Sequence, residues 1–323
     1  MTYTNRKAAE ALIPEATAKE ILQNVPEQSK FLQLATRTAD MSTKTVKRPV
    51  LESLPMAYFV DQTSGDTNDD DIGYKKTTSM EWGNLNLVAE EIACIVPIPE
   101  NVIDDADYDL WGEYRPQIEA AFGVVIDQAA FFGVNKPASW GTAIVPGAIS
   151  AGNTLAINSL TGKDLASHII GEGGLMEKVE LDGYEVNGFY AASSMKAKLR
   201  DLRTQDGALL YLPSLTTGTP STINGEPAYF DKNGVFNNSA LMIAGDWSKA
   251  VWAMRQDMTF KILDQAVIQD PSTKEIVYNL AQQDMVALRC KMRLAVQTVN
   301  PINRMNTDKT TRYPFAVLTP AGA

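Results

Sequence analysis

Carboxylates cluster in the first half of the chain, at Glu90, Glu91, Asp104, Asp105, Asp107 and Asp109. Such a group could bind a divalent cation or exchange protons in acid–base catalysis. Calcium loops converge several oxygens on one ion, as in the DxDxDG pattern, and that pattern is absent here. Asp107 stands just before a predicted helix and Asp109 lies in its first turn, where a carboxylate favours the helix dipole by roughly 0.3–1 kcal/mol. We interpret the cluster as a joint between a strand and a helix.

The other residue types that could do chemistry do not form a catalytic set. His168 is the single histidine, and it sits in an apolar, helix-like stretch with no marked nucleophile nearby. Cys94 and Cys290 are too few for a zinc site. The stretch around Gly162-Lys163 fails as a P-loop because Ile157 replaces a glycine and Asp164 replaces the Ser or Thr. The sequence predicts no enzyme, no cofactor and no metal site.

Glycines at 171–174, in the sequence "GEGG", lack the spacing of a dinucleotide-binding motif. They predict the end of a helix or a turn in which a glycine supplies a positive φ.

Composition describes an ordinary globular chain with an acidic surface. The 323 residues include 45% hydrophobic and 21% charged types, with a net charge of −10 and a pI of about 4.8. Such a charge disfavours binding of DNA by the whole surface. Two cysteines give no disulfide framework, no signal peptide is evident, and no apolar run is long enough to span a membrane. We expect an intracellular, soluble protein with no membrane partner.

The elements around the acidic cluster can be read from their patterns. Alternating apolar residues predict a strand that Pro97 and Pro99 stop. Pro116 predicts a kink near residues 112–116, at which the helix that follows effectively begins. The apolar stripe of this helix is predicted at Leu110, Tyr114, Ile118, Ala121, Val125, Ala129 and Phe132.

Two other regions are informative. Residues 61–77 read "DQTSGDTNDDDIGYKKT" between strand-like flanks, which predicts a long exposed loop. This loop is either an arm that reaches a neighbouring subunit or a surface hairpin without a partner. Near the C-terminus, "QDPSTK" predicts a turn between strands, and residues 302–323 are expected to end loosely.

These features occur in an order that resembles the tailed-bacteriophage major capsid protein family. The resemblance is carried by "LIPEATAKEILQNVPEQSKFLQLATRTADM", by "AYFVDQ" and the following "GY", by "MEWGNLNLVAEEIACIVPIPENVIDDADYDLWGEYRPQIEAAFGVVIDQAAFFG", and by "DMVALRCKMRLAVQTVNP". It is dense over residues 12–136 and 284–301. Residues 140–280 match mainly in the order of features.

The resemblance implies a mixed α+β subunit with the tailed-phage major capsid fold, which has an N-terminal arm, an extended β-hairpin loop, a peripheral domain with a long spine helix, and an axial domain. The expected boundaries are 1–41 for the arm, 42–95 for the extended loop, 96–145 and 250–300 for the peripheral domain, and 146–249 and 301–323 for the axial domain and C-terminal tail.

The implied function is that of a structural protein, assembled in the bacterial cytoplasm, whose pentamers and hexamers form the icosahedral shell of a virion around DNA. An encapsulin-like bacterial compartment shell shares the fold and is the alternative. An unrecognised hydrolase using Asp/Glu pairs is disfavoured because no nucleophile–base set exists. Expected partners are a portal, a decoration protein and a scaffolding protein. A separate scaffolding protein is preferred to a cleaved segment because the arm-like sequence follows soon after Met1.

Candidate interface residues are those of the loop tip, namely Asp69, Asp70, Asp71, Lys75 and Lys76. The three adjacent aspartates repel one another, which favours basic groups on a neighbouring subunit or plain solvation. Some family members join a loop lysine to an asparagine on a neighbour, with a glutamate as proton acceptor. In this sequence the matching positions hold Asp284 and Lys291, while Asn279 lacks a nearby glutamate, so the resemblance predicts a shell without covalent cross-links.

Overall fold

The computed structural model describes residues 29–57, 77–104, 110–157, 159–160, 164–202, 221–237, 239–270 and 272–321. The chain divides into two compact units. One comprises 1–26, 95–119 and 261–289, and the other comprises 27–94, 120–260 and 290–323. The domain boundaries expected from the sequence remain predictions.

A six-stranded mixed sheet forms the core of the larger unit. Its strand order is β5-β14-β9-β6-β8-β7. Three of the four inner strands, β6 (Gly188–Ala191), β9 (Met242–Gly245) and β14 (Phe315–Thr319), are buried at every residue. Strands buried along their whole length must be covered on both faces. The outer strands are β5 (Thr154–Ala156) and β7 (Ser221–Ile223), and β8 (Glu226–Phe230) lies between β6 and β7.

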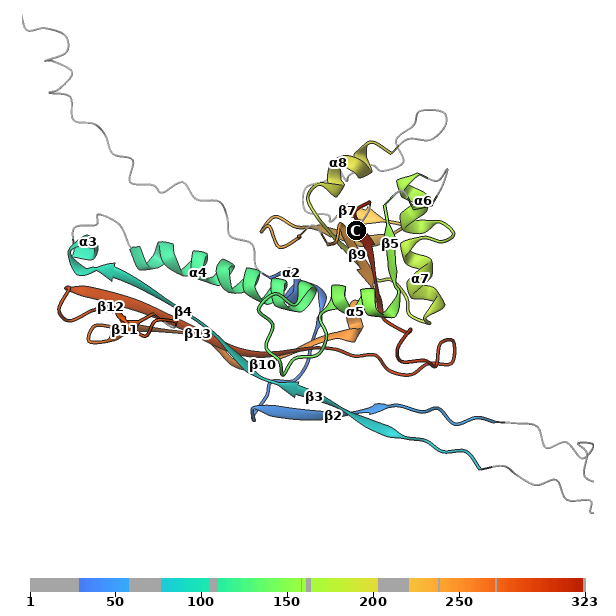
Figure 1. Cartoon of the computed structure of the whole chain (residues 1–323), viewed down its shortest axis with the longest axis horizontal. Coiled ribbons are helices and arrows are strands. Elements are labelled where there is room, and N and C mark those ends of the chain that lie inside the picture. Colours follow the sequence, from blue (N-terminus) through green and yellow to red (C-terminus); the bar gives the residue numbers. More distant parts are fainter. Residues whose placement is uncertain are drawn as a thin grey trace, which may run out of the picture. The chain divides into compact units, whose positions relative to one another are not determined.

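Two sets of side chains cover this sheet. Helices α6 (Leu165–Ile170), α7 (Leu175–Leu181) and α8 (Met195–Arg200) are labelled in Figure 1. They contribute apolar residues to one buried cluster with alternate strand residues such as Phe189 and Met242. The intervening strand residues Tyr190 and Phe315 meet aromatic rings from elsewhere in the chain. Because successive side chains of a strand point to opposite faces of the sheet, the two sets of residues lie on opposite faces.

Within this unit, η1 (Gln128–Phe132), a π-helical turn, supplies the second set of aromatic contacts. Its Phe131 lies 4.8 Å from Tyr190, 6.0 Å from Trp247 and 5.6 Å from Phe31, measured between ring centroids. Phe31 belongs to the short helix α2 (Lys30–Leu34). Offset and edge-on aromatic pairs of this kind add about 0.5–1.5 kcal/mol each beyond burial.

The C-terminal residues complete the sheet, and the expectation that residues 302–323 end loosely is wrong for the strand β14. This strand pairs with β5 in parallel and with β9 antiparallel, and Phe315 through Leu318 are fully buried. The four apolar residues Phe315–Leu318 lack the alternation that marks a half-exposed strand, and the prolines and glycine on either side made the segment resemble a loose end.

The predicted hairpin flanks are confirmed. Strands β2 (Thr45–Leu51) and β3 (Trp82–Val88) pair antiparallel from Thr45 with Val88 to Leu51 with Trp82, and they run side by side in Figure 1. The predicted loop spans residues 61–77, and all of it except Thr77 lies outside the described residues.

A four-stranded sheet has the order β1-β10-β13-β4, with β1 at Thr36–Arg37, β10 at Ala250–Leu263, β13 at Met285–Thr298 and β4 at Glu90–Pro99. The prediction that Pro97 and Pro99 stop the strand is wrong for Pro97, which lies inside β4, and is confirmed for Pro99, the last residue of the strand. A proline lacks one N–H, and β4 is an edge strand whose outer N–H groups need no partner strand.

Helix α4 (Leu110–Asp127) is present and continues into η1. It begins at Leu110 and runs through Pro116, so a start near residues 112–116 is wrong. The predicted stripe is also partly wrong. Ala121 and Val125 are exposed, and the buried positions are Ile118, Phe122 and Ile126, which follow steps of four residues. Either set of residues gives a stripe along one face of a helix. Because Ala121 and Val125 are apolar like Phe122 and Ile126, the sequence does not show which set is buried.

The smaller unit contains α3 (Glu100–Asp104) and a hairpin of β11 (Val267–Gln269) with β12 (Ile276–Asn279). The turn predicted at "QDPSTK" is confirmed. Asp270 accepts hydrogen bonds from the N–H groups of Ser272 and Thr273, and these bonds lower the pKa of its carboxyl group. No helix in the described ranges is both long and apolar enough to cross a bilayer.

Candidate functional site

The five loop residues predicted as an interface, Asp69, Asp70, Asp71, Lys75 and Lys76, lie outside the described residues. The structure does describe the base of the hairpin that carries them. Here Glu52 and Ser53 donate their N–H groups to the carbonyl of Glu81, and Glu81 donates its own to Ser53 Oγ. These bonds extend the ladder beyond the last paired residues of β2 and β3.

Three large apolar side chains are uncovered at this base. The exposed fractions are 76% for Met56, 49% for Met80 and 63% for Trp82. Isolated exposed apolar residues are common, but three at one end of a two-stranded ribbon favour a surface that another molecule covers. A two-stranded hairpin also has little stability of its own in water, so it needs support at its root.

A segment at residues 300–313 supplies part of that support. Arg304 donates a hydrogen bond to the carbonyl of Pro55 over 3.1 Å. Lys309 lies 3.4 Å from Glu52, with both side chains at least half exposed. An exposed ion pair of this kind contributes little stability. The segment at residues 300–313 can therefore support the hairpin only if other contacts hold it in place.

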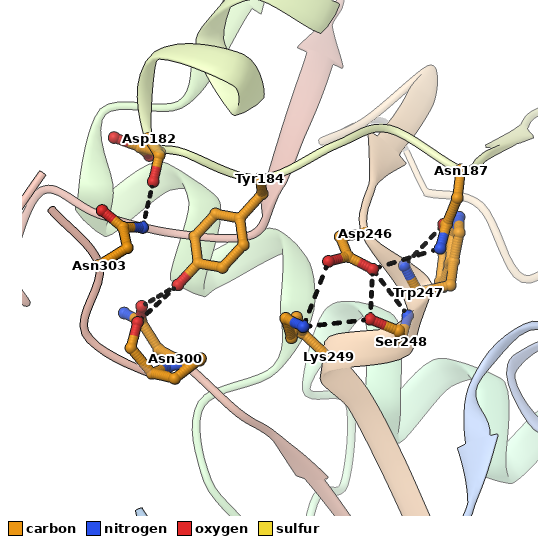
Figure 2. A network of polar contacts seen from close by, with 10 residues as sticks. Asp182, Tyr184, Asn187, Asp246, Trp247, Ser248, Lys249, Asn300 and Asn303 are labelled. Atoms are coloured by element: carbon orange, nitrogen blue, oxygen red, sulfur yellow. Dashed lines mark hydrogen bonds and ion pairs between the residues drawn. The ribbon is translucent and has the colours of Figure 1, made fainter. Parts of the chain in front are cut away.

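Asp182 fixes the segment to the six-stranded sheet, and part of the network is drawn in Figure 2. The carboxylate accepts hydrogen bonds from Asn153 Nδ2 at 2.6 Å, the N–H of Tyr313 at 2.9 Å and Asn306 Nδ2 at 2.7 Å. Its backbone carbonyl accepts one from Asn303 Nδ2 at 2.6 Å. A buried carboxylate with this many donors is satisfied as an anion without a metal ion.

Arg312 is 2% exposed and forms the second anchor of the segment. It donates through Nε to Asn300 Oδ1 and through Nη1 to the carbonyl of Asn306. Tyr184 donates its hydroxyl to Asn300 Oδ1 at 2.9 Å (Figure 2). Burial raises the pKa of Tyr184, and the Arg312 charge opposes that shift. These bonds hold a segment with no helix or strand in one conformation.

The start of β10 is set by the turn at Asp246, also shown in Figure 2. Its Oδ1 accepts from the N–H and the hydroxyl of Ser248, and Lys249 Nζ lies 3.6 Å from Oδ2. Asn187 accepts the N–H of Trp247, whose indole donates to the carbonyl of Gly188 at 3.0 Å. The turn therefore orients an indole that packs in the aromatic core.

Asp127 anchors the N-terminal segment, and sequence reasoning missed it. It is fully buried and accepts hydrogen bonds from Ser29 Oγ, Lys30 N–H and Phe31 N–H, at 2.5, 2.9 and 3.0 Å. Burial raises its pKa to about 6, against the lowering effect of these three bonds. The sequence did contain one signal for this role, because Asp127 is a single charged residue in an otherwise apolar helical stretch.

The remaining predicted residues can now be placed. His168 is buried and structural as predicted, since Nε2 accepts the N–H of Leu160 and Nδ1 faces the carbonyl of Asp164 at 2.7 Å. The turn at 171–174 is confirmed, with Gly173 at a φ of 77°. Asn279 ends β12, and its Nδ2 donates to Gln282 Oε1.

The acidic cluster is only partly described. Glu90 accepts a hydrogen bond from Ser139 and lies 4.0 Å from Lys44. Residues 105–109 fall outside the described ranges, which leaves the predicted capping roles of Asp107 and Asp109 as predictions. Within the described ranges, no group of three or more His, Cys, Asp or Glu is arranged to hold a metal ion.

Taken together, the described polar groups hold chain segments in place. Residues 9–303 match the model of the phage capsid family. The chain therefore belongs to the phage capsid family.

Relatives support this placement over nearly the whole length. The major capsid protein of Staphylococcus phage 80alpha is 26% identical over 282 residues, which is 85% of this chain and 78% of the relative. A solved structure from Microbacterium phage Oxtober96 is 38% identical with a TM-score of 0.83, covering 99% of this chain and all of the other. One from Mycobacterium phage Adephagia is 32% identical with a TM-score of 0.82, covering 100% and 99%. The capsid interpretation thus holds over the encapsulin-like alternative.

Proposed function

We propose that copies of this chain assemble, as pentamers and hexamers, into the icosahedral shell of a tailed phage that encloses packaged double-stranded DNA. The match to phage relatives along the chain supports this function. The net charge of −10 suits containment of DNA without sequence-specific binding, because the mean field does not attract phosphate.

The observation that carries the proposal is the braced but uncovered base of the hairpin. Met56, Met80 and Trp82 expose apolar surface, while Arg304 and Lys309 hold the same region from the anchored segment. A surface that is held in place and left apolar is typical of a contact with another macromolecule. A copy of the same chain is the partner that a closed shell supplies.

The finer parts of the proposal concern partners and location. We expect a separate scaffolding protein, a portal and a decoration protein, with assembly in the host bacterial cytoplasm. We expect no catalytic activity, since the buried polar groups of the described ranges are used to hold chain segments. The loop residues Asp69, Asp70, Asp71, Lys75 and Lys76 are expected at contacts between copies.

The shell is proposed to be held without covalent cross-links. Asp284 occupies a turn with a φ of 47°, and Lys291 lies in β13. A carboxylate has no ammonia to lose to an attacking amine, and a protonated lysine cannot serve as the base. Boiled, denatured particles should run as one band near 35.3 kDa on a gel. A ladder of multiples would contradict this part of the proposal.

Expression of the chain with a candidate scaffolding protein, followed by negative-stain imaging and sedimentation, tests the function directly. We expect closed particles of uniform diameter. Sedimentation of only a 35.3 kDa species at high concentration would overturn the proposal.

A further inference from the structure

The two cysteines of the chain stand on neighbouring strands of the four-stranded sheet. Cys94 lies in the edge strand β4 and Cys290 in its partner β13, and both belong to the larger unit. Cys290 is fully buried, Cys94 is half-buried, and both are present as thiols. A buried cysteine can serve as a small apolar side chain, so the geometry of the pair decides whether the two can also react with each other.

Two contacts show that the cysteines stand opposite each other. At one end of the strand pair, the N–H of Glu100 donates a hydrogen bond to the carbonyl of Asp284 over 2.9 Å. Cys94 lies six residues before Glu100 and Cys290 lies six residues after Asp284, so an antiparallel ladder in constant register brings the two cysteines level. A hydrogen bond between the Cys94 thiol and the backbone of Cys290 agrees with that register.

The two side chains also share one face of the sheet. In β13, Cys290 and Met292 are buried while Lys291 between them is half-buried. In β4, Cys94 is the less exposed residue between Ala93 and Ile95. Directly opposite residues of an antiparallel pair point their side chains to the same side, with Cα atoms about 4.5–5.5 Å apart. This spacing falls within the range of about 4.4–6.8 Å that a disulfide spans.

We propose that Cys94 and Cys290 of one copy form a redox site, at which a low-molecular-weight disulfide such as oxidised glutathione converts the two thiols into a disulfide between the strands. Within its sheet, the edge strand β4 is held by β13 alone. The new bond attaches this edge covalently and reversibly. Because it closes a long loop of the chain, it should also stabilise the folded subunit. The inference concerns the single subunit and does not rest on shell assembly.

The exchange takes place in two balanced steps. The Cys94 thiolate attacks one sulfur of the small disulfide, breaks its S–S bond and releases one thiolate. Cys290 then attacks the Cys94 sulfur of the mixed disulfide and releases the second thiolate. Two protein thiols are oxidised, the small disulfide is reduced to two thiols, and these take up the two cysteine protons. Burial raises the pKa of the Cys94 thiol, so the attacking thiolate is scarce at neutral pH and the bond should form slowly.

Oxidation of the unassembled full-length chain tests the site. Wild type, Cys94→Ser and Cys290→Ser are incubated in folded form with oxidised glutathione at mildly alkaline pH, and the remaining thiols are alkylated after denaturation. Wild type should lose both thiols and the mass of two hydrogen atoms, without retaining glutathione. Digestion should yield a peptide pair joined through Cys94 and Cys290, and a non-reducing gel should show a monomer.

The two serine variants report the order of the steps. Cys290→Ser should stop with glutathione attached to Cys94, because no second thiol resolves the mixed disulfide. Cys94→Ser should react about tenfold or more slowly, because Cys290 is fully buried. Oxidised wild type should melt about 5 °C or more above its reduced form, and the same treatment should raise the melting temperature of neither variant. A dithiol reductant should reverse the shift.

Other results would overturn the inference. Wild type that keeps both thiols, or that stops with glutathione on Cys94, would show that the cysteines act only as small apolar side chains. A band at twice the monomer mass would place the bond between copies. A joined peptide pair without a rise in melting temperature would show that the bond does not hold the edge strand. If a serine variant failed to fold, the peptides and melting temperature of wild type would still decide.

Discussion

The six-stranded sheet and the β2–β3 hairpin of the larger unit differ in how far their apolar side chains are buried. The inner strands of the sheet are buried on both faces, and the buried carboxylate next to it, Asp182, has several donors. The hairpin leaves Met56 and Trp82 mostly exposed, and its ion pair with the rest of the chain is a surface pair. This difference indicates that the sheet stabilises the subunit, and it supports the proposal that the hairpin acts between subunits.

The largest effect on the unassembled subunit is expected from Asp182→Ala. The substitution leaves the buried N–H of Tyr313 without an acceptor and removes the main partner of Asn153 and Asn306. We expect a loss of about 2–4 kcal/mol in the free energy of unfolding, measured by denaturant titration. Asp201→Ala, at the exposed end of α8, should change it by less than about 0.5 kcal/mol. Equal losses from Asp182→Ala and Asp201→Ala would show that the buried Asp182 network does not stabilise the subunit.

Gly245→Ala tests how closely β9 and β14 pack. An added Cβ would fall against the ring of Phe315 and the carbonyl of Pro314, and backbone atoms cannot move aside cheaply. We expect a loss of about 1–3 kcal/mol, from the same titration. At Gly152 an added Cβ meets no atom within 4 Å, and only its φ of 81° opposes the change, so Gly152→Ala should cost about 1–2 kcal/mol.

Asp127 makes the subunit's stability depend on pH. Its pKa is about 6 when folded and about 4 when unfolded, so the folded state holds the extra proton between these values. The associated stability is present below about pH 4 and is lost as the pH rises through about 6. Between pH 7.5 and 5, wild type should gain about 1–2 kcal/mol more than Asp127→Asn in thermal or denaturant unfolding. Parallel pH profiles would contradict this.

The smallest effect is expected from Lys309→Ala, which removes the pair with Glu52. Both side chains are exposed, at 70% and 50%, so the unfolding free energy should fall by no more than about 0.5 kcal/mol. A loss as large as that of Asp182→Ala would show that the hairpin base stabilises the subunit itself.

Regular patterns made part of this structure predictable. The strands on either side of "DQTSGDTNDDDIGYKKT", the turn at Asp270 and the structural role of His168 follow from local chemistry. Pro97 of β4 was misleading because a sequence does not reveal that a strand lies at an edge of a sheet. Strand β14 was missed because the partners that bury it come from distant parts of the chain.

The anchors of the candidate site were the least predictable part. Asp127 contacts a segment nearly one hundred residues earlier in the sequence, and Asp182 contacts residues more than one hundred later. Such pairings depend on the tertiary fold, so neither spacing nor composition marks them. Loop residues, by contrast, could be selected from charge density alone, and their contacts remain a prediction.

One measurement tests the central claim, that the hairpin acts between subunits while the sheet holds each subunit together. A chain carrying Met56→Ser, Met80→Ser and Trp82→Ser would be compared with wild type by sedimentation velocity, and the unassembled chains by thermal unfolding. The account predicts that the variant melts within a few degrees of wild type yet sediments as subunits or small oligomers, because the altered side chains are exposed before assembly. Closed shells at wild-type yield, or a variant that no longer folds, would contradict it.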